Sequence, residues 1–181
     1  MIILVGASAS GKTEVAKILR RKYGIRKVIT HTTRVMREGE ANHVDYHFVT
    51  RDEFNKLRKE DFFVETTLYN GNLYGTSKPE IGDDKVLIVD PNGLKAFKRL
   101  NDARIITFYM DASETTRMNR MLYRGDTLEH AKTRLENDRN DFSTDRMCAT
   151  DFIIDTEKFD IEQVADLVYK HYSKTLEALK S

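Results

Sequence analysis

Eight residues near the start of the chain have the types and the spacing of a phosphate-binding loop, G-x-x-x-x-G-K-[S/T]. They are Gly6, Ala7, Ser8, Ala9, Ser10, Gly11, Lys12 and Thr13. The glycines let backbone N–H groups approach a phosphate closely, beside the positive end of the dipole of a following helix. Lys12 adds a positive charge near the β and γ phosphates, and the hydroxyl of Thr13 can bind Mg²⁺.

The residues on both sides supply the strand and the helix that such a loop needs. Residues 2–5, Ile-Ile-Leu-Val, predict a short buried strand, and residues 14–19 have helical spacing. The alternative is a Gly/Ser turn that happens to precede Lys-Thr, and the strand and helix in register argue against it.

The composition excludes several classes of protein. Lys and Arg total 30 against 29 Asp and Glu, so a net charge of +1 gives no field to attract nucleic acid or an acidic membrane. The single cysteine, Cys148, excludes an internal disulfide. No apolar run is long enough to span a membrane, and a strand that begins at residue 2 leaves no room for a signal peptide. We expect a cytoplasmic protein with small-molecule substrates, no nucleic acid and no membrane.

The pattern of apolar and polar residues changes between residues 31 and 84. After a predicted strand at 28–29, alternation at 46–49 and 62–69 indicates strands on either side of a short helix. Asn70-Gly71-Asn72 is a hairpin turn signal. This segment is typical of a small mixed β lobe inserted into a larger domain.

An α/β pattern resumes afterwards. Strands are predicted at 86–89, 105–110 and 152–154, and helices at 91–101, 113–147 with a break at 124–126, and 160–179. This order predicts a three-layer core, a parallel sheet with helices on both faces. We expect residues 1–30 and 85–181 to form the core, residues 31–84 the inserted lobe, and residues from about 124 to 146 an arginine-rich helical lid.

A second informative stretch, residues 31–46, places Arg34 and Arg37 near Tyr46. Two guanidinium groups offer bidentate hydrogen bonds to a phosphate. The stretch resembles the T-T-R-x-x-R-x-G-E-x-x-x-x-D-Y-x-F-V signature of guanylate kinases. The resemblance continues in order through the segments 63–65, 71–76, 90–93 and 120–125 and covers nearly the whole chain.

The resemblance implies roles for individual residues on the acceptor side. The positions that match the family's GMP phosphate ligands are Thr30, Arg34, Arg37, Tyr46 and Tyr74. Those that match its guanine-reading residues are Glu65, Thr76 and Asp90. A carboxylate such as Glu65 can accept from both N1–H and the 2-amino group of guanine, whereas adenine offers an acceptor at N1.

On the donor side, Arg120, Arg124 and Arg134 match family arginines that close over the phosphates, where positioned cations stabilise phosphoryl transfer. With Lys12 and Arg34 they make up the expected catalytic set. We interpret Arg117, Arg139 and Arg146 instead as surface residues that pair with acids such as Glu136 and Asp138.

Several positions differ from the common family pattern. Ala7 and Ala9 replace the usual Pro and Gly of the loop, and Ala9 predicts a backbone without positive φ there. Ile88 replaces an acid two residues before Asp90, a change that could alter guanine contacts or the water shell of Mg²⁺. Asp90 itself also ends an apolar strand as a metal-shell aspartate does, so both interpretations of it stay open.

The leading expectation is phosphorylation of GMP and dGMP by ATP with Mg²⁺, by a monomer or a small homo-oligomer. One alternative is a kinase of this fold that acts on another phosphorylated acceptor. The other is a catalytically inactive module of this type that binds a phosphoprotein, although such modules typically lose the loop lysine and the lid arginines.

Overall fold

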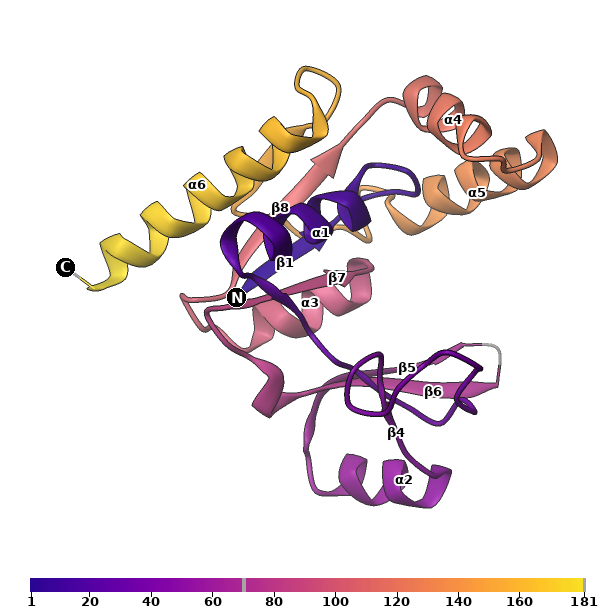
Figure 1. The fold of residues 1–181 in the computed structure, drawn as a ribbon, viewed down its shortest axis with the longest axis vertical. Helices are drawn as coiled ribbons and strands as arrows, with labels where there is room; N and C mark the ends of the chain where they lie inside the picture. The colour runs from indigo at the N-terminus through magenta and orange to yellow at the C-terminus, as the bar shows by residue number, and fades with distance from the viewer. Residues whose placement is uncertain (70, 181) are drawn as a thin grey trace.

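A five-stranded parallel sheet forms the centre of the molecule, with strand order β2-β7-β1-β8-β9 (Figure 1). The computed structural model describes residues 1–69 and 71–180. The strands of this sheet are β1 (Ile2–Val5), β2 (Arg26–Lys27), β7 (Lys85–Val89), β8 (Ile106–Asp111) and β9 (Phe152–Asp155). All neighbouring strands are parallel, as the alternation of strands and helices predicts, and the connections β1 to β2 and β7 to β8 each pass over one strand.

Helices cover both faces of this sheet. Successive side chains of β1 point to opposite faces: Ile2 and Leu4 are buried with α1 (Lys12–Tyr23) and α6 (Ile161–Lys180), whereas Ile3 and Val5 are buried with α3 (Pro91–Arg99). The prediction of a three-layer α/β core is therefore confirmed.

The second sheet is small and mixed, with strand order β4-β3-β6-β5. Its strands are β3 (His31–Thr32), β4 (His47–Phe48), β5 (Phe63–Tyr69) and β6 (Asn72–Ser77). Helix α2 (Arg51–Lys59) begins at a capping box made by Thr50 and Glu53, and a short 3₁₀ turn, η1 (Lys78–Glu80), follows β6. The predicted hairpin turn includes residue 70, which lies outside the described residues.

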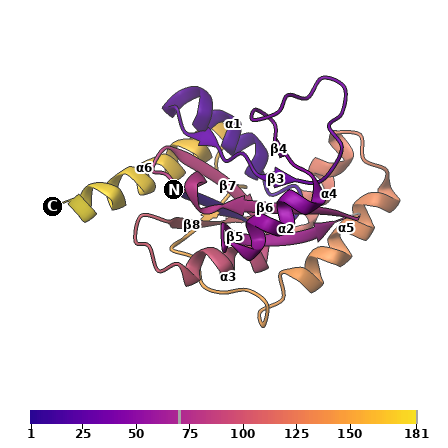
Figure 2. The ribbon, with the colours of Figure 1, turned by 90° about the horizontal axis from the view of Figure 1, so that it is seen from below.

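Two helices form a hairpin near the phosphate-binding loop, α4 (Glu114–Tyr123) and α5 (Leu128–Asp141). Met121, Ala131 and Leu135 are buried between them. Figures 1 and 2 place this hairpin and the C-terminal end of α6 at opposite ends of the molecule.

Two element boundaries differ from the predictions. The second strand is formed by residues 26–27 rather than 28–29, because Arg26 pairs with Lys85 while the side chain of Val28 turns into the core beneath α3. Helix α5 ends at Asp141 rather than near residue 147.

Candidate functional site

The phosphate-binding loop leaves the C-terminal end of β1 and enters α1. Gly6 has a φ of 154°, and a Cβ there would lie 2.6 Å from the carbonyl oxygen of Met110 on the adjacent strand β8. Gly11 has a φ of 94° and is the N-cap of α1. Both positions therefore require glycine, for space at the first and for backbone conformation at the second.

Ala9 contradicts the expectation of a negative φ, because its φ is 60°, in the left-handed region. This conformation costs an alanine about 1 kcal/mol. Contacts on both sides hold it: Ser10 N donates to Ala7 O at 3.2 Å, and Arg120 Nη1 donates to Ala9 O at 3.3 Å. The side chain also packs against the apolar cluster between α4 and α5, so the surrounding structure fixes the turn.

The Lys12 side chain folds back over the loop. Its Nζ donates to Gly6 O at 2.6 Å, to Ala7 O at 2.8 Å and to Ser10 Oγ at 3.2 Å. Burial lowers the pKa of this amine to about 8. A phosphate that enters the loop offers Lys12 charged oxygens in exchange for these neutral ones, and charge-assisted hydrogen bonds are the stronger kind.

A cavity of about 460 Å³ opens beside this loop. The residues that line it come from the loop, from α4 and from the segment between β9 and α6: Ala9, Gly11, Lys12, Thr13, Glu14, Arg120, Arg124, Thr156, Phe159 and Ile161. Its lining combines a lysine, two threonine hydroxyls and two arginines with apolar side chains, which suits a nucleotide with its phosphates in the loop.

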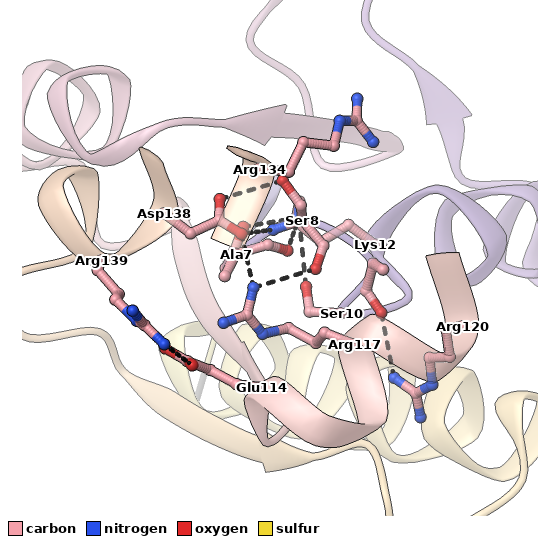
Figure 3. Close-up of polar contacts among 12 residues, drawn as sticks. Ala7, Ser8, Ser10, Lys12, Glu114, Arg117, Arg120, Arg134, Asp138 and Arg139 are labelled. Atoms are coloured by element: carbon pink, nitrogen blue, oxygen red, sulfur yellow. Dashed lines mark hydrogen bonds and ion pairs between the residues drawn. The ribbon is translucent and has the colours of Figure 1, made fainter. Parts of the chain in front are cut away.

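The three arginines predicted to close over the phosphates lie differently with respect to this cavity. Arg120 donates to Thr156 O at 2.7 Å and to Thr156 Oγ1 at 3.0 Å, and Arg124 pairs with Asp126 through two bonds of 2.9 and 2.5 Å. Arg134 is not among the lining residues. Its Nη1 lies 3.9 Å from Asp126, and Figure 3 shows its side chain extended away from the loop.

Arg117 corrects a second expectation, since it is not a surface residue. It is 5% exposed and pairs at 2.6 Å with Asp138, which is 8% exposed. Asp138 also accepts hydrogen bonds from Ser8 of the loop. Arg139 and Arg146 do form exposed ion pairs, with Glu114 and Asp141, as expected.

A second cavity, of about 530 Å³, lies between the small sheet and α3. Four of the residues predicted to contact the acceptor line it together: Thr30, Glu65, Thr76 and Asp90. Ile88 lines this cavity as well, so the residue that replaces the family's usual acid lies in the predicted acceptor site. The structure thus brings the predicted guanine-reading residues into one site.

Glu65 is a partly buried acid of this second cavity. Its Oε1 accepts from Thr76 Oγ1 at 2.7 Å. Burial is the main cause that raises the pKa of the Glu65 carboxyl; the hydrogen bond from Thr76 opposes the rise, and the charge of Asp90 adds to it. Asp90 caps α3, its Oδ1 accepting from Gly93 N at 2.7 Å. It does not line the cavity beside Lys12 and Thr13.

Of the predicted phosphate ligands, Thr30 lines the cavity with Glu65, and the others form a separate group on the small lobe. The guanidinium of Arg34 lies 5.4 Å from the centre of the Tyr46 ring, and the Tyr46 and Tyr74 rings meet edge to face at 6.1 Å. Arg34 Nη2 donates to Glu40 Oε1 at 2.6 Å, and the other oxygen of Glu40 accepts from the backbone N–H of Arg37 at 2.8 Å.

Sequence reasoning assigned no role to Glu40 or to the Arg117–Asp138 pair. Glu40 stands three residues after Arg37 within the motif, which is a signal that it orients that arginine loop. The signal for Arg117 and Asp138 was their helical spacing from the buried residues of α4 and α5, which the many charges in this region obscured.

The two cavities belong to neighbouring strands. Val5 of β1 pairs with Val89 of β7 in parallel register, so the phosphate-binding loop and Asp90 begin side by side at the C-terminal edge of the sheet. Ligands bind at this edge in open α/β sheets.

A model of the family described as guanylate kinase matches residues 1–171. The chain belongs to the guanylate kinase family. The guanylate kinase of Neisseria gonorrhoeae is 33% identical over 162 residues, which are 85% of this chain and 78% of that protein. The guanylate kinase of Thiobacillus denitrificans is 34% identical over 186 residues, a match that covers 98% of this chain and 88% of that protein.

Solved structures agree with the fold. The crystal structure of guanylate kinase from Anaplasma phagocytophilum matches with a TM-score of 0.61 at 24% identity, covering 96% of this chain and 84% of that one. Guanylate kinases are nucleoside monophosphate kinases, so this chain is a phosphotransferase. Within the described residues, no helix is both long and apolar enough to cross a membrane.

Proposed function

We propose that this chain transfers the γ-phosphoryl group of ATP to GMP or dGMP, giving ADP and GDP or dGDP. The observation that carries the proposal is Glu65, a partly buried carboxylate in a cavity at the sheet edge from which the phosphate-binding loop also leaves. Release of ADP with GMP as the only acceptor tests it. No residue assigned here reads the 2′-hydroxyl of the acceptor, so dGMP should also be phosphorylated.

Recognition of guanine rests on the hydrogen-bond pattern of Glu65. One of its oxygens accepts from Thr76, and the carboxylate retains lone pairs for N1–H and the 2-amino group. Adenine would place its N1 lone pair against the carboxylate. A buried polar group without a partner discriminates strongly between ligands. Thr30 and Asp90 also line this cavity, together with further polar residues, Thr66, Thr67, Asn92 and Arg99.

Arg34, Arg37, Tyr46 and Tyr74 hold the GMP phosphate in this proposal. Glu40 bonds the guanidinium of Arg34 and the backbone of Arg37, and so keeps the two arginines on one loop close together. An oxygen of the GMP phosphate attacks the γ-phosphorus of ATP. The bond from that phosphorus to the β–γ bridging oxygen breaks, and ADP leaves with the electron pair.

Lys12, Arg120, Arg124 and Arg134 stabilise the charge that spreads over the transferred group. Arg120 and Arg124 already line the donor cavity, whereas Arg134 has to move toward it. Residues from about 124 to 146 act as the lid, residues 31–84 as the acceptor-binding lobe, and residues 1–30 and 85–181 as the core. Closure of such a lid excludes water, which limits hydrolysis of ATP.

The donor set fits Mg²⁺ carried by ATP. The hydroxyl of Thr13 lines the cavity, and the described residues contain no cluster of three or more His, Cys, Asp or Glu side chains that could hold a metal by themselves. Mg²⁺ usually binds through one or two protein oxygens and substrate phosphates. Bound Mg²⁺ supplies charge neutralisation between the β and γ phosphates, and Thr13 would be its protein ligand.

Substitution of Arg37 by lysine should weaken GMP binding about tenfold and leave ATP binding within a factor of two. Lysine keeps the charge but loses the bidentate geometry. Calorimetric titration with each nucleotide measures both constants. Arg51→Lys, on the same lobe, is the matched control because Arg51 bonds Gly71 O and has no assigned role in binding. Equal loss of both affinities would place Arg37 outside the acceptor site.

The raised pKa of Glu65 predicts a pH dependence of guanosine binding. Guanine needs the ionised carboxylate, so affinity should fall as the pH drops through this raised pKa, and binding at or below that pKa should release a proton. Guanosine is the probe because it has no phosphate to titrate. Calorimetry in two buffers of different ionisation enthalpy counts the proton, and Glu65→Gln is the control. Proton uptake in place of release would contradict the role of Glu65.

The dependence of turnover on the guanine base distinguishes GMP from a different phosphorylated acceptor. Glu65 and Thr76 would have no guanine to read, so turnover would not depend on N1–H or the 2-amino group. Comparison of GMP with inosine monophosphate, which lacks only the 2-amino group, measures that dependence. We expect inosine monophosphate to lose at least tenfold in kcat/KM because one hydrogen bond to Glu65 is missing.

A further inference from the structure

Arg117 of α4 and Asp138 of α5 form a buried ion pair directly behind the phosphate-binding loop (Figure 3). Arg117 Nη1 donates to Asp138 Oδ2 at 2.6 Å. Two buried charges are costly to remove from water unless further hydrogen bonds satisfy them. The loop residue Ser8 supplies three such hydrogen bonds, whereas Nε of Arg117 has no partner among the described residues.

Three polar groups of Ser8 contact this pair. The backbone N–H of Ser8 donates to Asp138 Oδ2 at 3.0 Å, its hydroxyl donates to Asp138 Oδ1 at 3.0 Å, and its carbonyl oxygen accepts from Arg117 Nη1 at 3.4 Å. Arg117 and Asp138 therefore fix a single residue of the loop, although they lie 109 and 130 positions further along the chain.

The next residue in the loop is Ala9, with its left-handed φ of 60°. A non-glycine residue persists in that region only where its surroundings over-determine it. Ser8 is held by Asp138 and Arg117 on one side of Ala9, while Ser10 N bonds Ala7 O across the turn. The buried pair thus lies where it can hold the strained turn in place.

We propose that Arg117 and Asp138 are positioning residues for ATP binding: by fixing Ser8 they keep Ala9 in its left-handed conformation, and they keep the N–H groups of the loop arranged for the phosphates before ATP arrives. The proposal rests on ATP being the donor. It assigns to α4 and α5 a role in preorganising the loop, in addition to the proposed role of residues from about 124 to 146 as the lid.

A second pair joins the same two helices and provides the matched control. Arg139 of α5 bonds Glu114 of α4 at 2.8 and 2.6 Å, but both side chains are exposed, and within the described residues neither forms a hydrogen bond or an ion pair with the loop. If the buried pair served only to join α4 to α5, removal of the exposed pair would have the same kind of effect on ATP binding as removal of the buried pair.

The test is the double variant Arg117→Met/Asp138→Leu, because apolar replacement of a buried ion pair often leaves a protein folded. Calorimetric titration with MgATP should show a dissociation constant raised about tenfold, while KM for GMP stays within a factor of two and the thermal midpoint stays near that of the wild type. Glu114→Gln/Arg139→Gln should bind MgATP as the wild type does.

Addition of Ala9→Gly to the double variant should return the dissociation constant for MgATP to within about threefold of the wild-type value, because glycine adopts the left-handed conformation without strain. A role limited to stability predicts no such rescue. If the double variant does not fold, Ser8→Ala, which removes only the hydroxyl contact with Asp138, should weaken MgATP binding about threefold.

Three results would overturn the proposal: wild-type affinity for MgATP in the double variant, an equal loss of affinity in the control variant Glu114→Gln/Arg139→Gln, or no rescue by Ala9→Gly. If Ser8→Ala is needed, unchanged MgATP affinity in that variant would also overturn it. These binding measurements use no acceptor. Absence of GMP turnover together with normal MgATP binding would therefore contradict the proposed acceptor and leave this inference standing.

Discussion

Replacement of Lys12 by alanine should lower kcat by about three orders of magnitude while the protein stays folded. The amine lies within the loop, bonded to two carbonyl oxygens and Ser10, at the position where the β and γ phosphates are expected. Loss of one preorganised group that stabilises transition-state charge typically costs about a hundredfold to a thousandfold in kcat. Steady-state ADP release measures the effect.

Lys17→Ala is the matched control for this variant. Lys17 lies on the same helix, α1, but is exposed and paired only with Glu14. It should retain wild-type kcat. Circular dichroism and thermal unfolding should show that both variants are folded. A Lys12→Ala protein with near-normal kcat would remove the phosphate-binding loop from the mechanism.

Substitution of Glu65 by glutamine should lower kcat/KM for GMP about a thousandfold. The amide keeps the size of the side chain and one acceptor for Thr76, but its NH₂ group faces the donors of guanine. Sites built on buried hydrogen bonds lose about this much or more when donor and acceptor no longer match. The measurement is initial rate against GMP concentration at saturating MgATP.

Glu60→Gln is the control for Glu65→Gln, since Glu60 is exposed at the end of α2 on the same lobe. It should leave kcat/KM unchanged. The dissociation constant for MgATP should be the same in both variants and in the wild type. Retention of full GMP activity by Glu65→Gln would show that another group reads the guanine ring.

Much of the architecture could be predicted from local patterns. The apolar run 2–5, the loop glycines and the helix after them form one strand–loop–helix unit, and solid apolar runs such as 86–89 indicated strands of a parallel sheet. The mixed sheet of the small lobe followed from alternation at 62–69. These features depend on residues close together in the sequence, so the sequence reveals them directly.

The backbone of Ala9 could not be predicted in the same way. The local preference of alanine favours negative φ. Tertiary contacts from Arg120, and the packing of Ala9 against the α4–α5 cluster, override this preference. Those contacts come from residues more than a hundred positions away, so a local argument has no access to them.

The burial of Arg117 and Asp138 is a similar case, although a signal existed. Arg117 stands one helical turn before buried Met121, and Asp138 follows buried Ala131 and Leu135 at helical spacing. An arginine and an aspartate on the inner faces of two neighbouring helices indicate a buried pair. The frequency of charges in this region led instead to the prediction of surface residues.

The roles of the individual site residues remain predictions, and one experiment bears on most of them. ADP release with MgATP should be measured against GMP, dGMP, AMP, CMP and UMP under identical conditions. Turnover with GMP and dGMP alone is the predicted result, and it would show that Ile88 is compatible with guanine selection. No turnover with GMP, or equal turnover with AMP, would contradict the assignment of Glu65 as the guanine-reading residue and of GMP as the acceptor.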